Sequence, residues 1–250
     1  MRRPALRIVL LGVLAFAISL VVLWPARWLA PALPPGMRCT DWAGSLWRGQ
    51  CTGFKWSAAG AAPVSIDSLQ WQLHPLTLLR GRVQADVELA QAAMQAQGRI
   101  TMGMGGRLQV ERLTASGVLD HRLLGALPKG WSTRAELKDV AFEYVGGALH
   151  ALSGTGIARE LHDERGTSLG DYQLQFGPGA SAPFKGQLRD LKGPLQLAAS
   201  ITVNADLGWQ LDGTASLRAG SPPALARALD QLGGADINGQ RRISIAGTFD

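Results

Sequence analysis

From residue 64 to the C-terminus, apolar and polar residues alternate along the chain with a period of two. In the clearest run, residues 207–217, odd positions carry Leu, Trp, Gly or Ala, while most even positions carry Gln, Asp, Thr or Ser. Similar runs cover residues 69–74, 83–89, 172–176, 195–203 and 243–249. Because successive side chains of a strand point to opposite faces, the pattern predicts half-buried antiparallel strands with one wet face.

Two of these runs lose their phase, because two polar residues separate apolar ones at residues 110–113 and 137–140. A β-bulge restores the apolar side chains to one face and bends the strand. We therefore expect bulges near Arg112 and Lys138, and a curved sheet.

Helical patterns are few. Residues 120–126 predict a short helix, and residues 222–232 predict a second one with Ser221 as N-cap and Gly233 as C-cap. Most predicted strands have no helical crossover between them, which excludes a doubly wound parallel sheet. The expected fold is mainly β: an elongated, twisted and curled antiparallel sheet with one or two short helices. One convincing amphipathic helix is too little to cover the apolar face, so we expect the sheet to curl onto itself, receive a partner or hold a lipid.

The N-terminal pattern is different, because residues 8–24 carry no charge and follow Arg2, Arg3 and Arg7. With residues 5 and 6, the run approaches the roughly 20 residues that a helix needs to cross a bilayer. It predicts a single transmembrane helix ahead of the sheet, with the arginine-rich flank in the cytoplasm and the rest of the chain exported. Trp24 and Trp28 are expected at one membrane interface, and Arg7 at the other.

A cleaved signal peptide is the alternative, since residues 30–32 (Ala-Pro-Ala) resemble a processing site. The apolar run is longer than the usual ~7–15 residues of a signal peptide, and prolines crowd the cleavage region, so a retained anchor is favoured. The expected organisation is then a cytoplasmic tip at residues 1–7, the membrane helix at 8–24, an extended proline-rich stalk at 25–36 and an exported β domain at 37–250.

The chain has two cysteines, Cys39 and Cys51, close together and just beyond the predicted stalk. In an oxidising compartment, an even number of nearby cysteines indicates a disulfide. Metal binding and free thiols are the alternatives. A metal site would need more ligands, and His74, the nearest histidine, has no partner at metal-binding spacing.

Between the cysteines, Gly44 and Gly49 flank the apolar pair Leu46-Trp47. We expect two short strands joined by a tight turn. Trp47 is the candidate for contact with a partner protein, although a tryptophan folded back onto the sheet fits the same pattern.

Composition supports a folded β protein without nucleic-acid binding. The 250 residues are 46% hydrophobic and 18% charged and include 31 glycines, which argues against disorder. The net charge of +6 comes from scattered basic residues rather than from a basic run interleaved with aromatics. Attraction to anionic membrane lipid explains the charge more simply.

No catalytic constellation is evident. Residues 166–170 match G-x-S-x-G, but a strand rather than a helix follows them, so we expect a hairpin turn instead of a nucleophile elbow. The glycines at residues 103–106 also precede a strand rather than a helix, so we expect a turn there instead of a phosphate-binding loop. His74, His121, His150 and His162 are dispersed. We predict no enzyme activity, cofactor, metal or small-molecule substrate.

Several short motifs carry a resemblance in their order: GSLWRG at 44–49, LQWQLHP at 69–75 leading into LLRG at 78–81, LKGPLQL at 191–197, and GQRRISIAGTF at 239–249. With the N-terminal anchor, this order resembles the type II secretion system protein N family. The two cysteines are not part of that pattern.

The resemblance implies a non-enzymatic, single-pass protein of the Gram-negative inner membrane with its β domain in the periplasm. It implies contacts with other inner-membrane components of the secretion apparatus or with the outer-membrane secretin. The main rival is an AsmA-like lipid-handling protein, which also has one N-terminal helix and long antiparallel strands that form an apolar groove. An exported hydrolase is a third reading.

Overall fold

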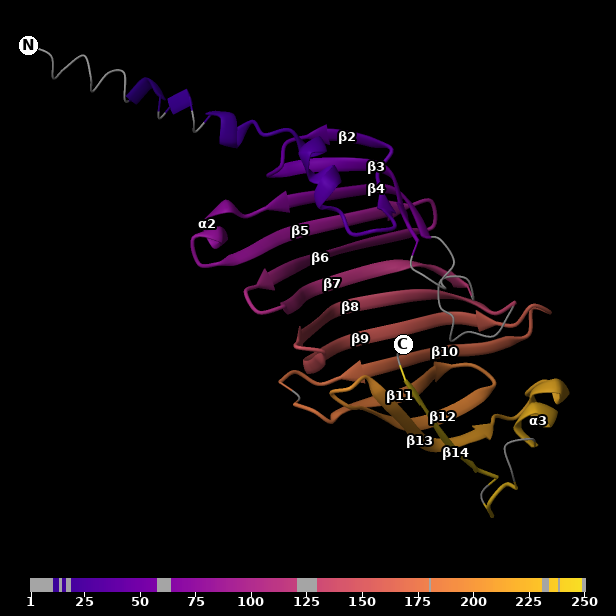
Figure 1. The fold of residues 1–250 in the computed structure, drawn as a ribbon. Coiled ribbons are helices and arrows are strands. Elements are labelled where there is room, and N and C mark those ends of the chain that lie inside the picture. The colour runs from indigo at the N-terminus through magenta and orange to yellow at the C-terminus, as the bar shows by residue number, and fades with distance from the viewer. Residues whose placement is uncertain are drawn as a thin grey trace, which may run out of the picture. The chain divides into compact units, whose positions relative to one another are not determined.

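The computed structural model describes residues 11–13, 15–16, 19–57, 64–120, 130–179, 181–230, 234–237 and 239–248. The chain divides into two compact units, Met1–Ala92 and Ala93–Asp250, hereafter unit 1 and unit 2. Figure 1 shows that both are built mainly from strands.

Unit 1 is an antiparallel sheet in the order β1-β3-β4-β5, with β2 also paired to β3. Its elements are η1 (Ala26–Ala32), β1 (Met37–Arg38), β2 (Asp41–Gly44), β3 (Arg48–Trp56), β4 (Val64–Leu73), α2 (Pro75–Leu78) and β5 (Arg82–Gln91).

Unit 2 is an antiparallel meander in which the strands pair in chain order from β6 to β14. Its elements are β6 (Met94–Gly103), β7 (Arg107–Asp120), β8 (Ser132–Val145), β9 (Ala148–His162), β10 (Ser168–Phe176), β11 (Phe184–Lys192), β12 (Leu195–Val203), β13 (Gly208–Leu217), α3 (Pro223–Asp230) and β14 (Arg241–Thr248). The prediction of a mainly β, antiparallel fold with few short helices is confirmed.

The period-two pattern sorts side chains onto two faces of unit 2. Leu211 lies opposite Ile201 on β12 and Ile245 on β14. The next residue, Asp212, lies opposite Ser200 and Ser244, and the Ser244 hydroxyl donates to its carboxylate over 2.8 Å. Apolar residues therefore meet on one face and polar residues on the other.

Both predicted bulges are present. The pairing of β7 with β8 shifts between Val110 and Leu113, and Arg112 between them has a φ of 52°. The shift places Val110 and Leu113 opposite Phe142 and Val140, two alternate residues of β8, so apolar residues stay together.

The second bulge lies beside the predicted position. The pairing of β8 with β9 shifts between Lys138 and Ala141, and Asp139 rather than Lys138 takes the left-handed conformation, with a φ of 49°. A third irregularity, at Glu160, was not predicted; its φ is 52°, and its N–H donates to the Asp171 carboxylate over 2.8 Å.

Each unit has its own small core. In unit 2, Phe184 is 0% exposed and packs in a cluster with Leu149, Ile201 and Val203. In unit 1, Cys51 clusters with Phe54 and Ile66.

The predicted membrane helix lies partly outside the described residues. Residues 11–13, 15–16 and 19–22 are helical. Among the described residues, no helix has the length and apolar character needed to span a membrane.

The expectation of an extended stalk is wrong for residues 26–32, which form the 3₁₀ helix η1. The Trp28 N–H donates to the Pro25 carbonyl over 3.2 Å, and Ala26 is buried. Proline is compatible with this helix because its fixed φ is close to the helical value. Packing of Ala26 and local hydrogen bonds therefore outweigh the extended preference of the proline-rich segment.

The helix predictions of the C-terminal half have mixed outcomes. The helix expected at 120–126 falls almost entirely on residues outside those described. The helix expected at 222–232 is α3, which begins at Pro223, and the predicted C-cap Gly233 is also outside the described residues. Pro222 therefore precedes α3 directly, where Ser221 was expected, and the Ser221 hydroxyl lies 2.8 Å from the Pro194 carbonyl oxygen in the connection between β11 and β12.

Candidate interaction surfaces

The predicted tight turn joins β2 and β3, which pair from Asp41–Thr52 to Gly44–Gly49. Gly44 has a φ of +82°, and a side chain there would come within 2.5 Å of the Arg48 carbonyl oxygen. A Cβ at Gly49 would lie 2.3 Å from the ring of Trp71. The turn therefore requires a glycine at the first position and lets Trp71 lie directly on the backbone at the second.

Trp47, at this turn, is half-buried and points toward the N-terminal segment. Its indole Nε1 donates to the Val21 carbonyl oxygen over 2.7 Å, and the neighbouring Leu46 N–H donates to the Trp24 carbonyl over 2.7 Å. Carbonyls in the last turn of a helix have no partner within the helix. Trp47 thus satisfies one of these groups for residues 19–22, and the hairpin holds the segment that leads toward the predicted anchor.

Two further tryptophans support the hairpin, because Trp71 binds Leu46 and Trp42 packs on Trp71. The Trp71 indole donates to the Leu46 carbonyl over 3.0 Å, and its ring meets Trp42 edge to face with centroids 5.9 Å apart. We call Trp42, Trp47 and Trp71 the tryptophan junction. Gly44 and Gly49 were the sequence signal for Trp47, whereas Trp71 also packs against the core of unit 1.

Trp24 and Trp28, predicted at the membrane interface, pack edge to face with ring centroids 5.9 Å apart. They are 41% and 62% exposed. Their role at a bilayer stays a prediction, and Arg7 lies outside the described residues.

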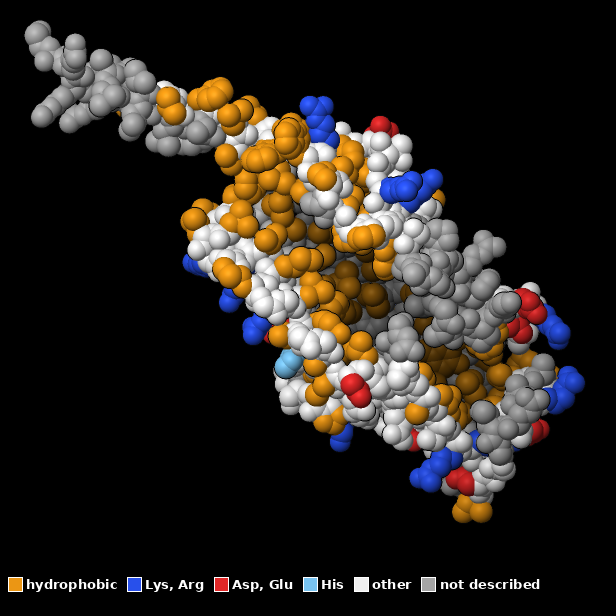
Figure 2. All heavy atoms as spheres, in the orientation of Figure 1, with side chains coloured by type: hydrophobic (Ala, Val, Ile, Leu, Met, Phe, Trp, Pro, Cys, Tyr) orange, Lys and Arg blue, Asp and Glu red, His pale blue; other side chains and the backbone are white. Residues whose placement is uncertain are grey.

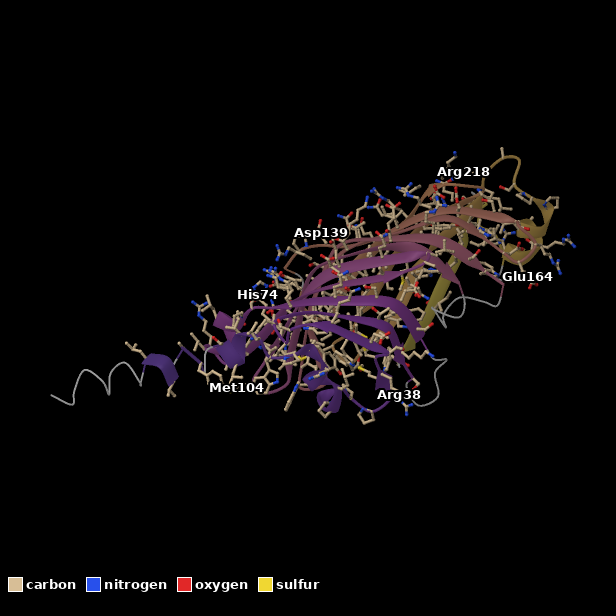
Figure 3. All side chains as sticks on the ribbon, turned by 90° about the horizontal axis from the view of Figure 1, so that it is seen from above. Arg38, His74, Met104, Asp139, Glu164 and Arg218 are labelled. Atoms are coloured by element: carbon tan, nitrogen blue, oxygen red, sulfur yellow. A yellow bond between two sulfur atoms is a disulfide. The ribbon has the colours of Figure 1, made fainter. Side chains whose placement is uncertain are left out.

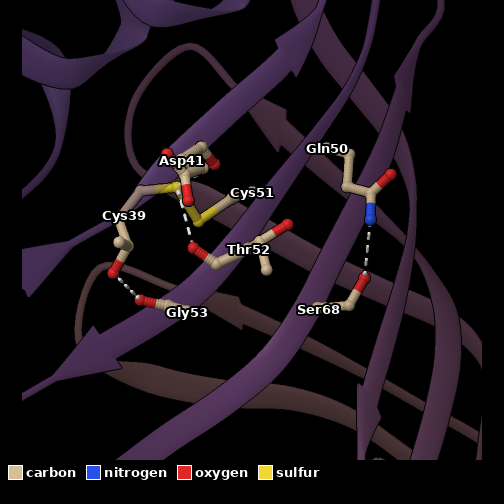
Figure 4. Close-up of a disulfide and its surroundings, with 8 residues drawn as sticks. Cys39, Asp41, Gln50, Cys51, Thr52, Gly53 and Ser68 are labelled. Carbon is tan, nitrogen blue, oxygen red and sulfur yellow. Dashed lines mark hydrogen bonds between the residues drawn. A yellow bond between two sulfur atoms is a disulfide. The ribbon is translucent and has the colours of Figure 1, made fainter.

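Cys39, in the connection between β1 and β2, is brought against Cys51 on β3 (Figure 4). Their sulfur atoms are 2.05 Å apart, as in a disulfide, and their Cα atoms are 5.8 Å apart, within the range that disulfides require. Cys51 is buried in the core of unit 1, and the Thr40 hydroxyl next to Cys39 donates to the Gly53 carbonyl over 3.1 Å. Oxidation of this pair in the exported protein stays a prediction.

The second candidate surface is the apolar face of unit 2. Its rows run across several strands, for example Val110–Phe142–Leu152 and Ile201–Leu211–Ile245. Many of these side chains are only half-buried, and Ile245 is exposed. Figure 2 shows hydrophobic side chains gathered on one face. Among the described residues this face is only partly buried, and the binding of a ligand to it stays a prediction.

The candidate chemistry has structural explanations. Ser168 of the G-x-S-x-G match is the first residue of β10 and pairs with His162 on β9. In the turn before it, the Asp163 carboxylate accepts hydrogen bonds from the Thr167 and Arg165 N–H groups, which lower the pKa of Asp163. Within the described ranges, no cluster of three or more His, Cys, Asp or Glu side chains could hold a metal.

One polar pair was not anticipated from the sequence. The Ser132 hydroxyl lies 2.8 Å from His162 Nε2, while His162 Nδ1 lies 2.6 Å from the Glu160 carbonyl oxygen. A hydrolase places a carboxylate behind the imidazole to stabilise the imidazolium that forms during the reaction. Here a backbone carbonyl occupies that position, so the pair joins the ends of β8 and β9 without the arrangement of a catalytic triad.

These features define a β-sheet protein whose candidate sites are contact surfaces. Residues 35–244 match the model of one protein family, which is described as type II secretion system (T2SS), protein N. These residues include almost all of the described strands. The chain belongs to this family, which is not a known enzyme family.

A curated relative is the type II secretion system protein N of Vibrio cholerae serotype O1 (strain ATCC 39315 / El Tor Inaba N16961). It is 34% identical over 90 residues, which is 35% of this chain. The match spans 34%, about a third, of the length of that relative. No solved structure matches the chain.

Proposed function

We propose that this protein is a non-enzymatic component of the type II secretion apparatus that acts through protein–protein contacts. Residues 8–24 anchor it in the inner membrane with the N-terminus in the cytoplasm, and its β units lie in the periplasm. The family match over residues 35–244 supports the first statement, because it covers the folded β part of the chain.

The charge-free run at residues 8–24 supports the anchor, and the contacts of Trp47 and Leu46 support a fixed orientation of the sheet relative to it. Trp47 and Leu46 both donate to backbone carbonyls of the N-terminal segment, those of Val21 and Trp24. A flexible tether would need no such contacts. A segment fastened by hydrogen bonds holds the sheet in a defined orientation to the anchor, which suits a component that must meet its neighbours at fixed positions.

The expected partners are other inner-membrane components of the apparatus and the outer-membrane secretin. Co-purification of the tagged full chain from membranes tests this. Recovery of one of these components supports the proposal, provided that it disappears with a tagged, unrelated single-pass protein. Loss of the chain without any effect on secretion through the apparatus would contradict it.

A second function, AsmA-like lipid handling, is favoured by the half-exposed apolar face of unit 2. A contiguous apolar surface of this kind on a soluble protein generally marks a binding site. Lipid extracted from the purified full chain, and lost when the exposed Ile245 is replaced by Asp, would support it. Comparison with Ser244→Asp, at the adjacent position of the polar face, controls for the substitution itself.

A further inference from the structure

The loop between β4 and β5 carries three exposed leucines, two of which are the most exposed among the described leucines of unit 1. Leu76, Leu78 and Leu79 are 77%, 45% and 85% exposed, and α2 has no buried residue. Arg80 and Arg82 follow directly and are also exposed. We call Leu76, Leu78, Leu79, Arg80 and Arg82 the α2 tip.

Hydrogen bonds hold the α2 tip in this form. At its base, the Thr77 hydroxyl donates to the His74 carbonyl over 2.7 Å, and His74 Nε2 lies 2.7 Å from the Asp86 carboxylate on β5. The Gly81 N–H donates to the Leu78 carbonyl over 2.9 Å. These hydrogen bonds fix the conformation of the turn. The outward position of the leucines is therefore a defined feature of the fold.

The position of the tip relates it to the anchor. Figures 1 and 3 show α2, next to the labelled His74, at the end of unit 1 from which the N-terminal segment leaves. The exposed pair Trp24 and Trp28 belongs to that segment. Aromatic residues of this kind are typical of the headgroup region of a bilayer.

The side chains of the α2 tip fit one binding partner, a lipid bilayer. Exposed leucines followed by arginines match a bilayer interface, where apolar side chains enter the acyl region and basic groups remain at anionic headgroups. We propose that the α2 tip is a second membrane contact: it inserts its leucines into the leaflet on the side of the β units and places Arg80 and Arg82 against anionic lipid. This rests on the proposed anchoring, and it means that the sheet is held to the membrane at two points.

Depth-dependent quenching tests the contact in the full chain. The protein carries a fluorescent label at Leu79→Cys and is reconstituted into vesicles of phosphatidylcholine, with or without phosphatidylglycerol, that contain spin-labelled lipid. Val22→Cys reports on the anchor itself. Lys55→Cys is the matched control in unit 1, because it pairs with Arg38, which Figure 3 shows at the opposite end of the unit.

The contact predicts quenching at positions 79 and 22 but not at 55. Replacing both arginines by Gln lowers the ratio of inserted to free tip in anionic vesicles roughly fivefold for each charge removed. Quenching at position 22 without quenching at position 79 overturns the α2 contact and leaves the anchor standing. The exposed tip would then be assigned to a protein partner, because the vesicles contain no other protein. Absence of quenching at both positions overturns both proposals.

Discussion

The indole of Trp47 donates a hydrogen bond to the carbonyl oxygen of Val21, 26 residues earlier in the chain, over 2.7 Å. This bond joins the β2–β3 hairpin to the last helical turn before η1. The conformation of the hairpin thus bears on the direction in which the N-terminal segment leaves the sheet.

Trp47→Phe keeps most of the ring and removes the donor. Loss of the bond should lower the free energy of unfolding by about 0.5–1.5 kcal/mol. Trp47→Ala should in addition reduce recovery of the apparatus partners by more than its effect on folding accounts for. Denaturant unfolding and co-purification measure the two effects, with the exposed Trp56→Phe as control. Trp47→Ala protein that unfolds at much lower denaturant yet retains its partners would leave Trp47 with a folding role alone.

Gly49→Ala should be costly because the added Cβ would come within 2.3 Å of the Trp71 ring. Displacing that ring also strains its bond to the Leu46 carbonyl. We expect a loss of about 1–3 kcal/mol in unfolding free energy, as for an overpacked core. Gly177→Ala is the control, since no heavy atom lies within 4 Å of the position of its Cβ. Equal stability of the two variants would show that Trp71 does not rest on Gly49.

The Cys39–Cys51 pair should be oxidised in protein taken from the periplasm. Mass spectrometry of non-reduced peptides should recover the two cysteines in one linked fragment. By chain-entropy arithmetic for a loop of this size, the bond stabilises the fold by at most ~3 kcal/mol, which the double Cys→Ser variant would lose. Two thiols that react with an alkylating agent before reduction would disprove the bond.

Tyr172 should make the stability of unit 2 depend on pH in alkali. Its hydroxyl donates to the Leu169 carbonyl over 2.6 Å, and burial raises the pKa of Tyr172 from 10.0 to about 12. The unfolded chain releases this proton near pH 10 and the folded chain only near pH 12. Stability is therefore unaffected below pH 10 and falls between pH 10 and 12, at most ~1.4 kcal/mol per pH unit.

Tyr172→Phe should flatten this part of the profile. The matched control is Tyr144→Phe, the other tyrosine of the chain, which is less buried. Denaturant unfolding at several pH values between 9 and 12 makes the comparison. An unchanged alkaline profile in Tyr172→Phe would show that other groups control it.

Local pattern was enough to predict the parts of the fold that depend on the alternation of side chains. The strand at 207–217 and the bulge at Arg112 follow from which residues must share a face. The turn between Gly44 and Gly49 follows from the conformations that glycine allows. Each of these features is set by residues close to it in sequence.

Other features depend on distant parts of the chain and have no local pattern. Nothing around Trp47 specifies Val21 as its acceptor, and the preference of a proline-rich segment for extended structure gave no sign that Ala26 would be buried. The alternation of residues 69–74 gave no prediction for the leucines at 76, 78 and 79. Their exposure shows that they point outward.

The central claim is that a membrane anchor holds the β units in the periplasm, and the most direct test is the topology of the full chain. A reporter that is active only in the cytoplasm is fused after Asp250, and the same fusion lacking residues 1–24 serves as the positive control. The anchored, exported arrangement predicts a silent reporter on the full chain and an active one on the truncated chain. Activity on the full chain would place the β units in the cytoplasm and contradict the proposed function.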